Sequence, residues 1–307
     1  MAASDDAIMS EPLRLHAAIA NYPHAVALKS GGARSARVSL IFEEVEPITR
    51  AFRRMVRTLD FDVCEIALTT LAQAYAWGKP IVGIPVVLMR GFHHGALVCR
   101  GDSPICGPRD LPGKRIGVRA YSQTTGVWVR GILQSDYGID PAGITWVTAE
   151  DAHLAEYQDP PTVERIAPGS DLSAMLMDGT IDAGIALTGL DAAQVRTVIA
   201  DARLRAAEWF GRTRIYPANH VVCVKQSLLK QHPWLAAELM DMFTAAKEEA
   251  VTAPAEARWR SIVGEDVLPY GLSSNRAAIE CGLEFAAQQG LIPRAMAAEE
   301  LFAAIRT

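Results

Sequence analysis

The sequence lacks any apolar segment long enough to cross a membrane. Its longest apolar run is "IVGIPVVLM", residues 81–89, whereas a spanning helix needs about 18 apolar residues. The opening segment "MAASDDAIMSEPLRLH" also lacks the basic start and the apolar stretch that mark a secretory signal. We therefore expect a cytoplasmic protein with no membrane partner.

Cysteine is scarce, and basic residues are not in excess. None of the five cysteines forms a C-x-x-C pair, and an odd number cannot all pair within one chain, so we expect free thiols. The 30 lysines and arginines are outnumbered by 35 aspartates and glutamates. A nucleic-acid-binding domain would show a basic patch, so no nucleic-acid partner is expected. The cluster "TRAFRRMVR" alternates with apolar residues at helical spacing and predicts the solvated face of a helix.

Several catalytic motifs are also missing. The sequence contains no G-x-S-x-G elbow, Walker loop or dinucleotide fingerprint, which argues against hydrolase, phosphoryl-transfer and hydride-transfer chemistry. No cofactor is expected. His93, His94, His220 and Glu65 could in principle bind a divalent metal, but no H-E-x-x-H, H-x-H or Cys/His spacing supports such a site. We therefore expect no metal.

The sequence does contain short apolar runs that alternate with helical patterns. This alternation predicts an α/β fold with largely parallel sheets. The expected helices include 48–59, 69–78, 124–138 and one long amphipathic helix over 227–251. The expected strands are 13–19, 61–68, 81–89, 95–100, 114–118, 144–149, the run after Gly179, and 219–224.

The pattern restarts at "RDLPGKRIGVR", which indicates two lobes. We predict a discontinuous first lobe of residues 1–105 and 218–307, with residues 106–217 inserted as the second lobe. Strand ends and helix N-termini would then face each other across a ligand cleft, as in other open α/β sheets.

Two predicted helix N-termini could each hold a carboxylate, at Thr69–Thr70 and at Thr124–Thr125. The alternative is that these threonines are plain N-caps. Arg90 and Arg119 stand at predicted strand ends, where a guanidinium could clamp a carboxylate in bidentate fashion or pair with an acid such as Glu65.

Aromatic residues and histidines supply the remaining candidates. Phe92, Trp128 and Tyr22 could sandwich a flat ring, with core packing as the stronger alternative for Trp128. His153 lies in a polar segment and is expected to be incidental. In "RGFHHGALVCR", His93 and His94 follow an apolar run at a predicted turn. We expect one imidazole to point into the cleft while the other packs against it or steers it.

Long segments of the chain closely resemble the 4,5-dihydroxyphthalate decarboxylases. They are "FRRMVRTLDFDVCEIALTT", "RGFHHGAL", "YSQTTGVWVRGILQSDYG", "ITWV", "AEY", "YPANH" and "LPYGLSSNRAAIE". The resemblance runs from about Phe52 to the C-terminus and implies a type 2 periplasmic-binding-protein-like fold. The loop "RAYSQ" and residues 188–214 depart from the family pattern, which leaves the choice of substrate open.

The resemblance implies conversion of 4,5-dihydroxyphthalate to protocatechuate and CO2. Protonating the ring carbon that bears the departing carboxylate requires an acid with a pKa near neutral, for which histidine is suited. His94 or His93 is the expected donor, His220 is the alternate, and Glu65 could accept a phenol proton. Thr124, Thr125 and either Arg119 or Arg90 would anchor the retained carboxylate. The other expected binding residues are Thr69, Thr70, Tyr121, Ser122, Phe92, Trp128, Asn219 and Tyr22.

Two rival functions use the same cleft. One is a non-catalytic cytoplasmic binding protein for an aromatic or thiamine-precursor-like ligand. The other is another small-molecule lyase of this fold, such as those of the futalosine route to menaquinone. For the decarboxylase and for both rival functions, we expect a small-molecule partner and a homo-oligomer.

Overall fold

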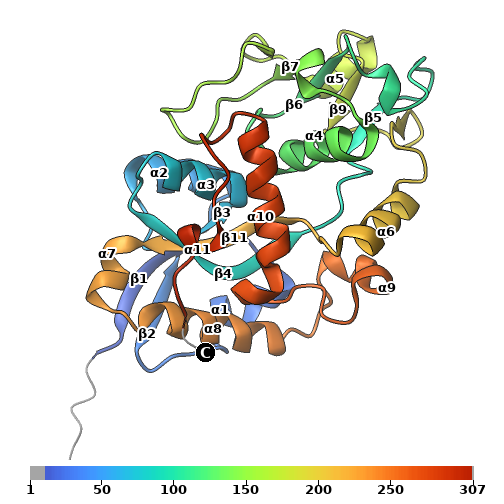
Figure 1. Cartoon of the computed structure of the whole chain (residues 1–307). Helices are drawn as coiled ribbons and strands as arrows, with labels where there is room; N and C mark the ends of the chain where they lie inside the picture. Colours follow the sequence, from blue (N-terminus) through green and yellow to red (C-terminus); the bar gives the residue numbers. More distant parts are fainter. Residues whose placement is uncertain (1–10, 306–307) are drawn as a thin grey trace, which may run out of the picture.

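The computed structural model describes residues 11–305, and its strands form two separate sheets (Figure 1). The first sheet has the order β2-β1-β3-β11-β4. Its strands are β1 (Leu13–Ala18), β2 (Val38–Phe42), β3 (Val63–Ala67), β4 (Ile81–Arg90) and β11 (Ala218–Lys225). Strands β1, β2 and β3 are parallel, and β11 runs antiparallel to β3 and β4.

The second sheet has the order β10-β5-β9-β6-β7-β8. Strands β6 to β9 pair in parallel, and β5 runs antiparallel to β9 and β10. The bounds are β5 (Leu97–Arg100), β6 (Arg115–Val118), β7 (Thr145–Thr148), β8 (Val163–Arg165), β9 (Ala183–Ile185) and β10 (Val195–Thr197). The predicted α/β architecture with two lobes is confirmed.

One strand lies in a different lobe from the one predicted. The segment "GALVCR" was expected in the first lobe, but β5 pairs only with strands of the second sheet. The chain therefore leaves the first sheet after Arg90 and returns to it at Ala218. His93 and His94 consequently lie on the crossover between the two lobes.

Helices cover both faces of the first sheet, which explains why its strands are apolar throughout. α2 (Thr49–Thr58) and α3 (Leu68–Ala76) share one core cluster, whereas α1 (Val26–Ser30) and α8 (Leu235–Glu248) belong to another. The remaining helices are α4 (Thr124–Tyr137), α5 (Leu172–Asp178), α6 (Ala202–Thr213), α7 (Gln226–Gln231), α9 (Arg260–Val263), α10 (Leu272–Gln288) and α11 (Ala298–Leu301). None of the helices in residues 11–305 is long and apolar enough to cross a membrane.

Helix α10 joins the lobes, because it packs on α3 of the first and α4 of the second (Figure 1). The contact is close: a Cβ atom added to Gly131 of α4 would lie 2.0 Å from the ring of Phe285 in α10. Glycine at position 131 thus permits the approach of the two helices.

Two helical predictions need correction. The long helix expected over 227–251 is divided into α7 and α8, because Pro233 between them has no backbone N–H to continue the helix. The arginine face of α2 is not purely solvated. Arg53 and Arg57 donate to backbone carbonyls of Asp151, Ala152 and His153 and so fasten α2 to the second lobe.

Candidate active site

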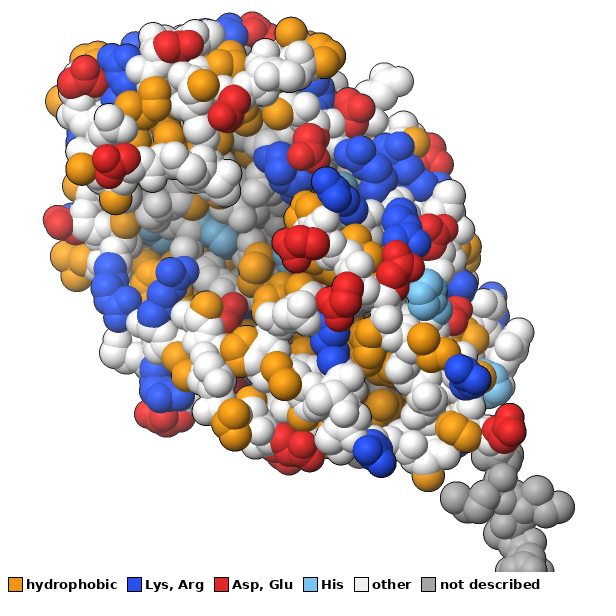
Figure 2. All heavy atoms as spheres, turned by 180° about the vertical axis from the view of Figure 1, so that it is seen from behind, with side chains coloured by type: hydrophobic (Ala, Val, Ile, Leu, Met, Phe, Trp, Pro, Cys, Tyr) orange, Lys and Arg blue, Asp and Glu red, His pale blue; other side chains and the backbone are white. Residues whose placement is uncertain are grey.

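A cavity of about 750 Å³ opens at the junction of the lobes, around the crossover that carries the histidine pair. Figure 2 shows a hollow on this face with histidine side chains inside it. The lining comes from residues 21–24 after β1, residues 89–96, the start of α6, and the 3₁₀ turn Ala255–Trp259, with Thr125 and Asn219 completing it. A volume of this size is typical of small-molecule sites.

The cavity brings together seven of the sixteen predicted site residues, which are Tyr22, Arg90, Phe92, His93, His94, Thr125 and Asn219. The others do not line it; they are Glu65, Thr69, Thr70, Arg119, Tyr121, Ser122, Thr124, Trp128 and His220.

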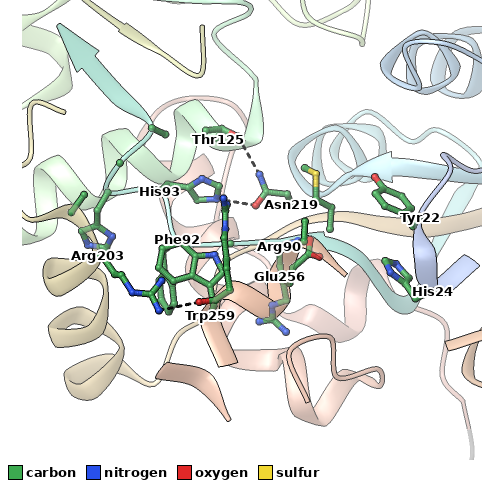
Figure 3. Close-up of a pocket in the computed structure, with 18 of the residues that line it drawn as sticks. Tyr22, His24, Arg90, Phe92, His93, Thr125, Arg203, Asn219, Glu256 and Trp259 are labelled. Atoms are coloured by element: carbon green, nitrogen blue, oxygen red, sulfur yellow. Dashed lines mark hydrogen bonds between the residues drawn. The ribbon is translucent and has the colours of Figure 1, made fainter. Parts of the chain in front are cut away.

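His93 is held in a fixed orientation. Its Nε2 lies 2.8 Å from Asn219 Oδ1, and Asn219 Nδ2 in turn donates to Thr125 Oγ1 (Figure 3). The imidazole also stacks against Trp128, with ring centroids 6.4 Å apart. Because an amide oxygen only accepts, Nε2 carries hydrogen. Burial lowers the pKa of His93 to about 4, so the imidazole is neutral at neutral pH in the empty cavity.

His94 is the less constrained of the pair. Its side chain is buried, and neither ring nitrogen has a hydrogen-bond partner among the described residues. The ring meets Trp209 edge-on at 5.8 Å, and burial lowers its pKa to about 4. Both residues line the cavity, but the His94 ring nitrogens are buried and the ring packs on Trp209, which is not a lining residue.

Glu65 and His220 form a buried pair behind the cavity wall. Glu65 Oε1 accepts hydrogen bonds from His220 Nδ1 at 2.6 Å and from the Tyr22 hydroxyl at 2.7 Å, while Oε2 accepts from Ala20 N. The Glu65 side chain is fully buried. Tyr22 is therefore the member of this group that lines the cavity.

Arg90 does not offer a free bidentate fork. Its terminal nitrogens donate to Asn275 Oδ1 and to the Tyr216 carbonyl, and its guanidinium lies over the Tyr216 ring. Burial lowers its pKa to about 10, which still leaves it cationic at neutral pH. Arg90 thus contributes positive charge to the cavity wall. Its terminal nitrogens, which were expected to bind a carboxylate, are already hydrogen-bonded to Asn275 and Tyr216.

The two helix N-termini expected to hold carboxylates face each other, and their threonine side chains are hydrogen-bonded together. Thr69 Oγ1 lies 2.7 Å from Thr124 Oγ1 and donates to Ser122 O at 2.8 Å. The two α-helices start side by side, so these threonines join the lobes in this structure. Arg119 does not line the cavity either, and it forms an ion pair with Glu150.

His153 is buried, although its polar sequence context suggested a surface position. It is 8% exposed, and its Nδ1 lies 2.9 Å from Thr70 Oγ1. Trp128 takes the predicted alternative: it packs in the core with its indole N–H donating to Ala218 O. Phe92 contacts Tyr216 and Trp259 at ring-centroid distances of 4.8 and 5.0 Å.

Several cavity residues have no recognisable signal in the sequence. His24 lines the cavity and belongs to no sequence motif. Arg203, Glu256, Arg258 and Trp259 also line the cavity, but they carry no motif. Only the folded chain brings α6 next to the turn at 255–259.

No cluster of three or more histidine, cysteine, aspartate or glutamate side chains within residues 11–305 is arranged to hold a metal ion. The four residues considered as ligands are divided. His93 and His94 line the cavity, whereas Glu65 and His220 bond to each other behind it.

The cavity is built on a fold shared with solute-binding proteins. The periplasmic aliphatic sulphonate-binding protein of Escherichia coli superposes with a TM-score of 0.58 at 14% identity, covering 95% of this chain and 97% of that one. The periplasmic sulfonate-binding protein of Methylobacillus flagellatus gives 0.57 at 11% identity, covering 95% and 92%. The periplasmic-binding-protein-like fold is therefore confirmed.

Sequence comparison gives closer relatives, although no family model matches the chain. A 4,5-dihydroxyphthalate decarboxylase of Pseudomonas putida is 33% identical over an alignment of 192 positions, gaps included, which covers 58% of this chain and 72% of that protein. A 4,5-dihydroxyphthalate decarboxylase of Comamonas testosteroni is 32% identical over an alignment of 324 positions, gaps included, which covers 94% of this chain and 96% of that protein. This chain belongs to the 4,5-dihydroxyphthalate decarboxylase family.

Proposed function

We propose that the protein removes CO2 from an aromatic dicarboxylate, with 4,5-dihydroxyphthalate as the substrate and protocatechuate as the product. The observation that carries this proposal is the pair of adjacent buried histidines lining the cavity of a chain from this family. A solute-binding site needs no proton donor facing the ligand, whereas decarboxylation of an aromatic ring does.

The charge of the cavity suits a dianion. Its lining includes three arginines, Arg90, Arg203 and Arg258, against one glutamate, Glu256. This leaves two more positive than negative side chains, and a phthalate carries two carboxylates. Most of the lining surface is apolar, but Arg203 and Arg258 are exposed residues, so water screens their attraction for an anion.

The reaction needs one proton at one carbon. The oxygen para to the departing carboxylate pushes its electrons into the ring, and the carbon bearing the carboxylate takes a proton from an imidazolium. The bond to the carboxylate then breaks, its electron pair restores the aromatic ring, and CO2 leaves. The product keeps the second carboxylate, and solvent returns the proton to the imidazole.

His93 is the proton donor in this proposal, because Asn219 fixes the orientation of its ring. An oriented acid is effective only if it is protonated, and His93 is neutral in the empty cavity. The dianionic substrate supplies the missing stabilisation, because an opposite charge nearby raises the pKa of an imidazole. His94 then stays neutral, since each imidazolium opposes the charging of its neighbour.

The test follows the ultraviolet spectrum of 4,5-dihydroxyphthalate during incubation with the protein, with and without chelator. We expect conversion to protocatechuate in both cases, and a loss of turnover of about 10²- to 10⁴-fold in His93→Asn. The matched control is His232→Gln, which changes a histidine outside the cavity. Binding with no spectral change under any metal condition would identify a binding protein instead. Wild-type turnover in both His93→Asn and His94→Asn would remove the histidines from the chemistry.

A further inference from the structure

The cavity has two chemically different ends. Figure 3 shows Arg203 and Trp259 at one end and Tyr22 and His24 at the other, with His93 and Asn219 between them. We call these the arginine end (Arg203, Arg258 and Trp259) and the tyrosine end (Tyr22 and His24). All five residues line the same cavity.

The arginine end is a set of donors. The guanidinium carbons of Arg203 and Arg258 lie 5.1 and 5.2 Å from the ring centroid of Trp259. One nitrogen of Arg203 donates to Arg258 O and Ser261 Oγ, which places Arg203 against the turn at 255–259. The buried indole Nε1 of Trp259 has no hydrogen-bond partner among the described residues. Arg203 is also in the first turn of α6, where the helix dipole favours an anion.

The tyrosine end is suited to hydroxyl groups. The Tyr22 hydroxyl donates to Glu65 Oε1, which leaves its oxygen able to accept a hydrogen bond from a ligand. The ring of His24 stacks on that of Tyr22, with centroids 5.1 Å apart. The Glu65 carboxyl oxygens lie behind Tyr22 and are already bonded to Tyr22, His220 and Ala20 N, so this end offers a ligand carboxylate no counter-charge.

We infer that the cavity orients its substrate, with both carboxylates at the arginine end and both hydroxyls at the tyrosine end, where one hydroxyl donates to Tyr22. This inference rests on the proposed function and adds to it the residues that select the ligand. The geometry of the substrate agrees, because the two carboxylates and the two hydroxyls of 4,5-dihydroxyphthalate occupy opposite edges of one ring. The central position of His93 then falls beside the ring.

The same arrangement gives Tyr22 a role in the reaction. The substrate hydroxyl para to the departing carboxylate passes its proton to the Tyr22 oxygen as the Tyr22 proton moves to Glu65. The substrate becomes a phenolate and Glu65 a neutral acid, and both protons return after CO2 has left. His220 donates to Glu65 throughout and holds its carboxylate in place, so His220 is a positioning residue.

The experiment titrates the whole protein with two probes by ligand-observed NMR, without any turnover. Phthalate has the carboxylates alone, and catechol has the hydroxyls alone. We expect Arg203→Gln to weaken phthalate binding about tenfold, as a lost charged hydrogen bond would, and to leave catechol within about twofold. Tyr22→Phe should weaken catechol about fivefold and spare phthalate. The matched control is Arg205→Gln, since Arg205 is also on α6 but pairs with Glu208 away from the cavity.

The unaffected probe in each variant shows that the variant is folded. Unchanged phthalate binding in both Arg203→Gln and Arg258→Gln would overturn the inference, as would a wild-type protein that binds no phthalate. Equal losses of both probes in each variant would also overturn it. If wild-type protein releases CO2 but the probe pattern is absent, only the orientation fails. If the pattern is present and no CO2 appears, only the proposed reaction fails.

Discussion

Binding of phthalate should draw a proton from solution into the cavity, and His93 should be where that proton goes. With a pKa of about 4, the imidazole of the free protein carries a proton in roughly 0.3% of molecules at pH 6.5. The proposed donor must be charged when the ring is attacked. Substrate binding and protonation therefore have to occur together.

The size of the effect follows from the charge that the ligand brings. A carboxylate about 4 Å from the imidazolium, at an effective dielectric constant of about 20, stabilises the charged form by about 4 kcal/mol. This raises the pKa by about 3 units, to about 7. At pH 6.5 the bound form is then about three-quarters protonated, so about 0.7 proton enters per phthalate bound. By the same reasoning kcat should fall above about pH 7, because it reports the protonation state of the complex.

Isothermal titration calorimetry in buffers of different ionisation enthalpy measures this number directly. We expect about 0.7 proton for the wild-type protein and for the His232→Gln control, and less than about 0.2 for His93→Asn. Zero uptake by the wild-type protein would refute the reasoning. Uptake lost in His94→Asn but kept in His93→Asn would refute the choice of His93 as donor.

Two further predictions concern how the lobes are held together. Gly131→Ala should destabilise the fold by roughly 1–3 kcal/mol, because its Cβ would overlap the Phe285 ring. Gly211→Ala, in open space within α6, should instead stabilise the fold by roughly 0.5–1 kcal/mol. Urea denaturation measures the free energy of unfolding of both variants, and equal changes in the two would contradict this prediction. Thr69→Val should lower the free energy of unfolding by roughly 1–3 kcal/mol, because the Ser122 carbonyl and the Thr124 hydroxyl lose their hydrogen-bond partner. A melting temperature equal to that of the wild type would show that this contact does not hold the lobes together.

The strand and helix pattern could be predicted because each element carries its own periodicity. The segment around His93 illustrates both the success and its limit. Its place after a buried strand indicated a site. The strand that follows, β5, belongs to the second lobe because it pairs with β9 and β10, which are distant in sequence. Local patterns do not encode that pairing.

The candidate site was predictable only where its residues lie on the crossover or at strand ends. Thr69 and Thr124 each have the features of an anion site when considered alone, and only the folded chain shows that each fills the site of the other. Arg203 is an unremarkable residue of a polar helix until the fold places it beside Trp259. Cavity residues brought together from separate elements leave no spacing in the sequence to detect.

Reaction of 4,5-dihydroxyphthalate in D2O, followed by NMR of the ring together with measurement of released CO2, tests the proposed chemistry most directly. The account predicts protocatechuate with one deuterium at the vacated ring carbon for each CO2, formed about 10²- to 10⁴-fold more slowly by His93→Asn. Substrate that is bound and then recovered intact, with no CO2 and no deuterium in the ring, would contradict it.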